Sequence, residues 1–272
     1  MSINITEAIR LAKICLPKIL STASSSVSLA ELSEHNVQVK SICRLWAGMG
    51  YIYQIKVQLP DNDISFIVKR VIPPCKSSRS MGDERKAASY LIEAKFYKHI
   101  VASTLIEKYD LSIPTPYHVE CNDNTDEVTI CMSLLQGSPG YCGDDDSIHA
   151  VLSWLSTLHA ATWGSKANEY VNQKLVQPIG SYWHLDTRPN EHNAISNRGW
   201  ESRLKLAARA IDERLKRDNM QCCIHGDAKE ANMLFDGKGG VSMYDLQYCG
   251  RAPPSVSYIH DIYFTYACIF SL

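Results

Sequence analysis

The feature that most restricts the fold of this chain is a polar loop between two short apolar runs. The loop covers residues 225–232 and carries Asp227 and, five residues later, Asn232. An apolar run, a turn and a second apolar run follow over 233–244 and lead to Asp245. Short apolar runs bounded by glycine and polar residues are typical of strands. The pattern therefore predicts a strand, a polar loop and a hairpin that ends in an aspartate.

The spacing His-x-Asp-x-x-x-x-Asn at residues 225–232 resembles the catalytic loop of kinases. Gly226 stands at its second position, and residues 245–247 read Asp-Leu-Gln where protein kinases have Asp-Phe-Gly. In both respects the chain resembles the aminoglycoside phosphotransferase superfamily, which includes choline kinases and ecdysteroid-kinase-like enzymes. No Ala-Pro-Glu tripeptide follows, which disfavours a protein kinase. By element order the resemblance extends over residues 39–264.

The resemblance implies a role for each polar residue of the loop and hairpin. Asp227 is expected to accept the proton of an attacking hydroxyl, since phosphoryl transfer depends mainly on positioning and charge stabilisation. Asn232 and Asp245 are expected to hold Mg²⁺, which prefers hard oxygen ligands. His225 is expected to orient the loop through hydrogen bonds.

Four residues upstream lie where the resemblance places a nucleotide-binding region. Gly48 and Gly50 stand between two predicted strands, where glycine lets the backbone approach phosphates. Lys69 ends a strand-like run, and Glu93 lies in the next predicted helix. The resemblance implies that Lys69 pairs with ATP phosphates and that Glu93 anchors it.

Each of these assignments has an alternative. A Gly-x-Gly turn by itself is usually a plain hairpin turn. Arg70 competes with Lys69, because successive strand residues face opposite sides and parity alone does not decide between them. Glu84 competes with Glu93, although an acid near a helix start also favours the helix dipole.

The order of patterns predicts an α+β, protein-kinase-like, two-lobe fold. Strand-like runs lie over 38–46, 51–59 and 64–72, a helix is expected over 83–107, and two more strands follow, the second over 128–134. With a helix near the start they make an N-terminal antiparallel sheet lobe, 1–136. A glycine-rich hinge at 136–143 leads to a mainly helical C-terminal lobe, 137–272, that opens with a helix over 147–163. The nucleotide cleft is expected near residues 134–143. The chain ends soon after Asp245, so the C-terminal lobe is expected to be truncated relative to the family.

Composition excludes several other classes. The net charge of −1 over 272 residues argues against a nucleic-acid partner. No apolar stretch reaches the length of a membrane-spanning helix, and the start of the chain is amphipathic, unlike a signal peptide. We therefore expect a cytoplasmic protein without stable membrane insertion. The ten cysteines form no Cys-x-x-Cys pair, which indicates reduced thiols.

Four further features have both a structural and a functional interpretation. The aromatic residues Tyr182, Trp183 and Trp200 are expected to pack in the core or between the lobes. The alternative is an aromatic box that binds a quaternary ammonium. The basic cluster Lys76, Arg79, Arg85 and Lys86 is either a solvated loop or lies near the phosphates. His159 is expected to be structural. Asp261 is either a brace for the catalytic loop or a surface acid.

The sequence thus predicts an ATP- and Mg²⁺-dependent phosphotransferase that acts on a hydroxyl of a small molecule. The alternative is an inactive nucleotide-binding or scaffold protein with the same fold. The sequence does not decide which acceptor is used, because a fold does not fix its substrate. The alternatives are choline, ethanolamine, an aminoglycoside, a sterol and a sugar-like alcohol.

Overall fold

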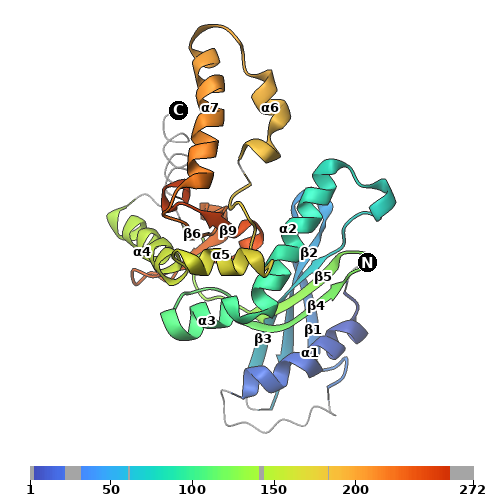
Figure 1. Ribbon diagram of the computed structural model, residues 1–272. Coiled ribbons are helices and arrows are strands. Elements are labelled where there is room, and N and C mark those ends of the chain that lie inside the picture. Colours follow the sequence, from blue (N-terminus) through green and yellow to red (C-terminus); the bar gives the residue numbers. More distant parts are fainter. Residues whose placement is uncertain (1–2, 22–31, 61, 141–143, 183, 258–272) are drawn as a thin grey trace. The chain divides into compact units, whose positions relative to one another are not determined.

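The computed structural model describes residues 3–21, 32–60, 62–140, 144–182 and 184–257, which divide into two compact units (Figure 1). The first unit runs to Ile106 and includes Ile113–Gln136, and the second has Glu107–Ser112 and the chain from Gly137 onward. The elements of the first unit are α1 (Ile5–Leu20), β1 (Val37–Arg44), β2 (Gly50–Gln58), β3 (Asp63–Val71), α2 (Met81–Lys98), β4 (Pro116–Asn122) and β5 (Glu127–Ser133), while α3 (Ile100–Tyr109) spans the division. The second unit has α4 (Asp145–Ala161), α5 (Ser165–Asn172), α6 (Pro189–Ala194), α7 (Gly199–Arg217), β6 (Cys222–Ile224), β7 (Met233–Phe235), β8 (Val241–Met243) and β9 (Gly250–Ala252).

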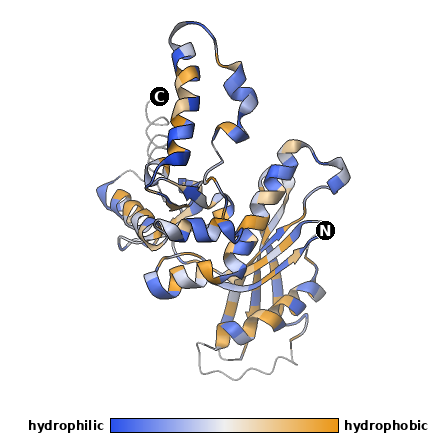
Figure 2. Cartoon of the chain, viewed as in Figure 1, coloured by the Kyte–Doolittle hydropathy of each residue, from blue (hydrophilic) through white to orange (hydrophobic). Residues whose placement is uncertain are grey.

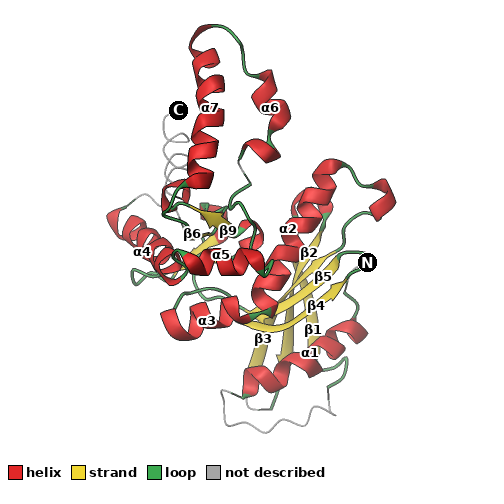
Figure 3. Cartoon of the chain, viewed as in Figure 1, coloured by secondary structure: helices red, strands yellow, loops and turns green. Residues whose placement is uncertain are grey.

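A five-stranded antiparallel sheet in the order β1-β2-β3-β5-β4 is the centre of the first unit (Figure 3). Side chains alternate between its faces along each strand. On β3, Phe66 and Val68 belong to a core shared with α1. Lys69, between Val68 and Arg70, therefore faces the other side of the sheet.

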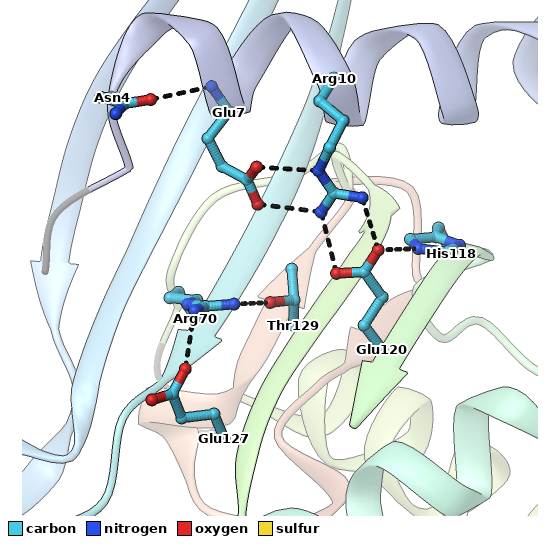
Figure 4. A network of polar contacts seen from close by, with 8 residues as sticks. All are labelled: Asn4, Glu7, Arg10, Arg70, His118, Glu120, Glu127 and Thr129. Carbon is cyan, nitrogen blue, oxygen red and sulfur yellow. Dashed lines mark hydrogen bonds and ion pairs between the residues drawn. The ribbon is translucent and has the colours of Figure 1, made fainter. Parts of the chain in front are cut away.

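Helix α1 covers one face of this sheet with a fully buried stripe that includes Ala8, Leu11 and Cys15. The 3.6-residue period places these positions on one side of the helix. Its polar edge is fixed by Arg10, whose guanidinium pairs with Glu7 and, at 2.7 Å, with Glu120 of β4 (Figure 4). The amphipathic start of the chain is therefore an integral layer of the unit.

Helix α2 begins with a capping box in which Ser80 and Asp83 each bond the backbone of the other. The single helix predicted over 83–107 is wrong in one respect, because α2 ends at Lys98 and α3 starts at Ile100. His99 between them has extended backbone angles, φ −104° and ψ −178°. The β-branched Ile100 and Val101 that follow are weaker helix formers than the residues before them.

The second unit combines helices with two small antiparallel ladders, β6–β9 and β7–β8. The predicted helix over 147–163 is α4, and the two short helices α5 and α6 follow it. The described part of the glycine-rich hinge pairs with β7, since Ser138 exchanges two backbone hydrogen bonds with Phe235. Helix α7 has no buried residue, and Figure 2 shows hydrophobic and hydrophilic residues mixed along it.

The α+β fold class predicted from the sequence is confirmed by this arrangement of an antiparallel sheet unit and a mainly helical unit. No helix among the described residues is long and apolar enough to cross a membrane.

Candidate active site

The polar loop lies between β6 and β7, and both strands are fixed by neighbours in the second unit. β6 pairs with β9, and β7 pairs with β8. The backbone N–H of Cys223 in β6 also donates to the hydroxyl of Thr162, which itself donates to Leu158 of α4. The start of the loop is therefore attached to the end of α4, where the chain reads Leu158-His159.

His225 is fully buried at the start of the loop and determines its shape. The backbone N–H of Asp227 donates to Nδ1 of His225, at 3.3 Å, so this nitrogen is the acceptor. The other ring nitrogen, Nε2, therefore carries the hydrogen and donates to the carbonyl of Tyr244, at 3.0 Å. Burial lowers the pKa of His225, which favours this neutral form. His225 thus joins the loop to the hairpin that leads to Asp245.

Gly226 permits the turn between His225 and Asp227. Its φ is +86°, a region in which residues with a Cβ are rare. A Cβ added there would come 2.1 Å from the carbonyl oxygen of Tyr248. Only glycine fits this position without displacing the backbone of residue 248.

The carboxylate of Asp227 is held through one of its two oxygens. The amide Nδ2 of Asn232 donates to the Asp227 carbonyl at 2.8 Å and to its Oδ2 at 3.2 Å. The ammonium of Lys229 lies 2.9 Å from the same Oδ2. Because Oδ2 receives both donors, Oδ1 is the better placed oxygen to accept a hydrogen bond from a substrate. The motif by itself predicts no role for Lys229, although this lysine stands two residues after the aspartate.

Asp245 follows β8 in a left-handed conformation, φ +67° and ψ +58°. Such a conformation is costly for a non-glycine residue and is concentrated at functional sites. The preceding Tyr244 donates its N–H to the carbonyl of Asn232 at 3.1 Å, and its hydroxyl bonds the carbonyl of Ala231. Asn232 and Asp245 are thereby joined through adjacent backbone.

These residues have the donor types of a hard-cation site. Asn232 uses its Nδ2 on Asp227, which leaves its Oδ1 as the atom for a metal, and Asp245 supplies a carboxylate. No group of three or more His, Cys, Asp or Glu side chains suited to a metal exists within the described residues. A cation held by Asn232 and Asp245 would complete its shell with water and phosphate oxygens, as Mg²⁺ commonly does.

In the first unit, Lys69 and Glu93 form a buried ion pair, with Nζ 2.6 Å from Oε2. Only 4% of Lys69 and 1% of Glu93 are exposed. The ring of Tyr90 lies beneath the ammonium, with its centroid 5.0 Å away. The competitor Glu84 is half exposed and lies 3.6 Å from Arg79 instead.

Arg70, the competitor of Lys69, lies on the sheet face that α1 covers. Its guanidinium donates to Thr129 and to Glu127 on the neighbouring β5 (Figure 4). The register explains this, because Arg70 stands opposite Thr129, and Lys69 stands opposite Ile130. Parity could not decide which of the two residues pairs with Glu93, but the packing of α1 and α2 on opposite faces of the sheet does.

The glycine turn connects β1 and β2 and satisfies several of its own amides. The N–H groups of Gly48 and Met49 donate to the carbonyls of Leu45 and Trp46. Gly50 has φ +141°, and a Cβ there would come 2.0 Å from the carbonyl of Arg70. Close packing on β3 is therefore a structural reason for glycine at position 50.

The model of the phosphotransferase enzyme family matches residues 57–258 of this sequence. The chain belongs to this family. Among solved structures, an amicoumacin kinase in complex with AMP-PNP, Ca²⁺ and Ami is similar, with a TM-score of 0.54 and 12% identity over 93% of this chain and 70% of that chain. The GDP complex of aminoglycoside 2′-phosphotransferase-IIIa has a TM-score of 0.54 and 14% identity over 93% of this chain and 80% of that chain.

At such identities these likenesses show the fold alone, and they agree with the α+β class. A comparison with curated proteins finds no match. The resemblance to the aminoglycoside phosphotransferases read from the loop is thus confirmed by the family match.

His159 and Tyr182, two further residues that the sequence singled out, have partners within the chain. His159 is buried, lies 3.1 Å from the Ser257 hydroxyl through Nε2, and has its pKa lowered to about 4 by burial. Tyr182 packs against Tyr248, and the Arg188 guanidinium lies 4.3 Å from its ring centroid, so a cation of the chain already occupies its face. Trp183 and Asp261 lie outside the described residues.

The basic cluster of the sequence is divided in the structure. Lys76 and Arg79 both pair with Asp126 in the turn between β4 and β5, at 2.9 Å and 2.6 Å. Lys86 instead lies over the ring of Trp46, with Nζ 4.8 Å from the centroid. The cluster is therefore neither uniformly solvated nor a single site.

Proposed function

We propose that this phosphotransferase moves the γ-phosphate of ATP to a hydroxyl of a small molecule. The observation that carries the proposal is the Asp227 carboxylate, which is held by Asn232 and Lys229 through Oδ2 and keeps Oδ1 for a substrate hydroxyl. Phosphoryl transfer requires a positioned carboxylate of this kind to accept the proton of the attacking hydroxyl.

In this proposal the hydroxyl oxygen of the acceptor attacks the γ-phosphorus. The bond from the γ-phosphorus to the β,γ-bridging oxygen breaks, and its electrons leave with ADP. The hydroxyl proton passes to Oδ1 of Asp227. Asn232 and Asp245 would hold Mg²⁺, which neutralises phosphate charge when bound. Lys69, anchored by Glu93, would pair with phosphate oxygens.

The named ligands of similar structures support a nucleotide and a small-molecule acceptor. One is a kinase complex with AMP-PNP, Ca²⁺ and Ami, and another is a GDP and kanamycin complex with a TM-score of 0.53 and 14% identity. We propose the same classes of ligand for this protein. In this proposal the first lobe, 1–136, binds the nucleotide, and the second lobe, 137–272, binds the acceptor. We also propose that the protein acts in the cytoplasm.

The test has two steps. AMP-PNP with Mg²⁺ should raise the melting temperature of the wild type, and AMP-PNP without Mg²⁺ should do so less. ADP release should then depend on one member of a panel of hydroxyl acceptors, and Asp227→Asn should abolish it while nucleotide binding persists. Nucleotide binding without turnover on any acceptor would favour the inactive, nucleotide-binding alternative.

A further inference from the structure

Lys86 and Trp46 form a contact to which the proposed reaction assigns no role. Trp46 belongs to the glycine turn and is 63% exposed, which is unusual for a large aromatic side chain. Lys86 lies in the second turn of α2, and only 17% of its side chain is exposed. The ammonium lies 4.8 Å from the indole centroid, within the range of a cation–π interaction. The turn is thus attached to α2 through this pair.

Lys86 also lies on the same side of α2 as Glu93, the partner of Lys69 in the buried ion pair. Residues four and three apart share one side of a helix, so Lys86, Tyr90 and Glu93 lie in a row. Tyr90 and Glu93 both contact Lys69. The row therefore extends from the Lys69–Glu93 pair toward the glycine turn, and Lys86 is its member next to the turn.

The phosphates of a nucleotide require more positive charge than the glycine turn and Lys69 supply, and Lys86 can provide it. Gly48 and Met49 donate their N–H groups to carbonyls within the turn, so the turn itself offers little positive charge to phosphates. The charge of Lys69 is balanced by Glu93 at 2.6 Å. Lys86 has a weaker acidic neighbour, Asp83, at 3.6 Å, and one of its sides lies on an uncharged ring.

We propose that Lys86 is a second phosphate-contacting lysine of the nucleotide site and that Trp46 holds its ammonium beside the glycine turn. The inference rests on the proposed function, because it supplies a residue for the triphosphate of the same nucleotide. The basic neighbours Lys76 and Arg79 are excluded from this role by their ion pairs with Asp126.

Equilibrium binding measured by calorimetry tests the inference without any acceptor. Lys86→Met should raise the Kd for Mg²⁺–AMP-PNP about tenfold, the change expected for one charge-assisted contact, and should leave the Kd for AMP unchanged. Lys86→Arg should bind nearly as wild type, because arginine keeps the charge and stacks on aromatic rings. Trp46→Leu should weaken AMP-PNP binding in the same direction and to a smaller extent.

Lys76→Met is the matched control, because Lys76 belongs to the same basic cluster but pairs with Asp126. This variant should bind AMP-PNP with the affinity of the wild type. Equal AMP-PNP affinity of Lys86→Met and the wild type would overturn the inference alone. An equal loss in Lys76→Met would also overturn it, as a general charge effect. A wild type that binds no AMP-PNP would overturn the proposed function, and this inference with it.

Discussion

Nζ of Lys69 lies 2.6 Å from Oε2 of Glu93, and both side chains are almost completely buried on the α2 side of the sheet. Taking two charges from water is costly, and their attraction offsets that cost only while both are present. The pair therefore predicts strong coupling between the two positions.

Glu93→Leu alone should lower the free energy of unfolding of the first unit by about 3–5 kcal/mol, because it leaves Lys69 buried without its partner. The double variant Lys69→Met with Glu93→Leu should recover most of that loss. Urea denaturation followed by circular dichroism measures both. Additive losses in the double variant would show that the pair is not coupled.

Gly226→Ala should abolish phosphotransfer and reduce stability well beyond the conformational cost of a left-handed alanine. The new Cβ would collide with the Tyr248 carbonyl, 2.1 Å away. Gly237→Ala is the matched control, because Gly237 also has a positive φ, +71°, and a Cβ there meets nothing within 4 Å. It should cost only about 1–2 kcal/mol and leave activity intact. Similar melting temperatures for the two variants would contradict the steric argument.

Acid should destabilise the second unit through His159. Its pKa in the folded state is lowered from 6.5 to about 4 by burial, so the unfolded chain binds the proton more readily between these values. Stability from the neutral ring is complete above pH 6.5 and is lost as the pH falls toward 4, by about 3 kcal/mol in total. Unfolding free energies measured across this window should fall less steeply for His159→Gln. An unchanged slope in this variant would assign the pH dependence to other groups.

Asp245 has a left-handed backbone conformation, and its carboxylate is a predicted metal ligand. Two substitutions separate the effect of the backbone from that of the carboxylate. Asp245→Gly should relieve the backbone strain, with a gain of up to about 1 kcal/mol, and should remove the Mg²⁺ dependence of AMP-PNP binding. Asp245→Ala should remove the same dependence and retain the strain. Thermal shift with and without Mg²⁺ compares them. Persistent Mg²⁺ dependence in both variants would assign the metal to other residues.

Much of the fold could be predicted because local patterns and tertiary structure agree. The strands β1, β2, β3 and β5 follow the predicted runs within a residue or two. Alternating apolar residues fit a strand buried on one side, and continuous apolar runs fit a strand buried on both. The helix break at His99 was not predicted, because a cap without glycine or proline leaves little signal in the sequence. The site residues Asp227, Asn232 and Asp245 stay predictions in their roles, although the structure joins them through His225 and Tyr244.

The sequence by itself determined the family, the α+β class and the identity of the polar loop, because these depend on the spacing of residues along one segment. Only the tertiary structure showed that Lys69, and not Arg70, pairs with Glu93, and that the basic cluster divides between contacts with Asp126 and with Trp46. These choices depend on which helix covers which face of the sheet. That information lies in contacts between residues distant in the chain, so neither parity nor spacing within a single strand carries it.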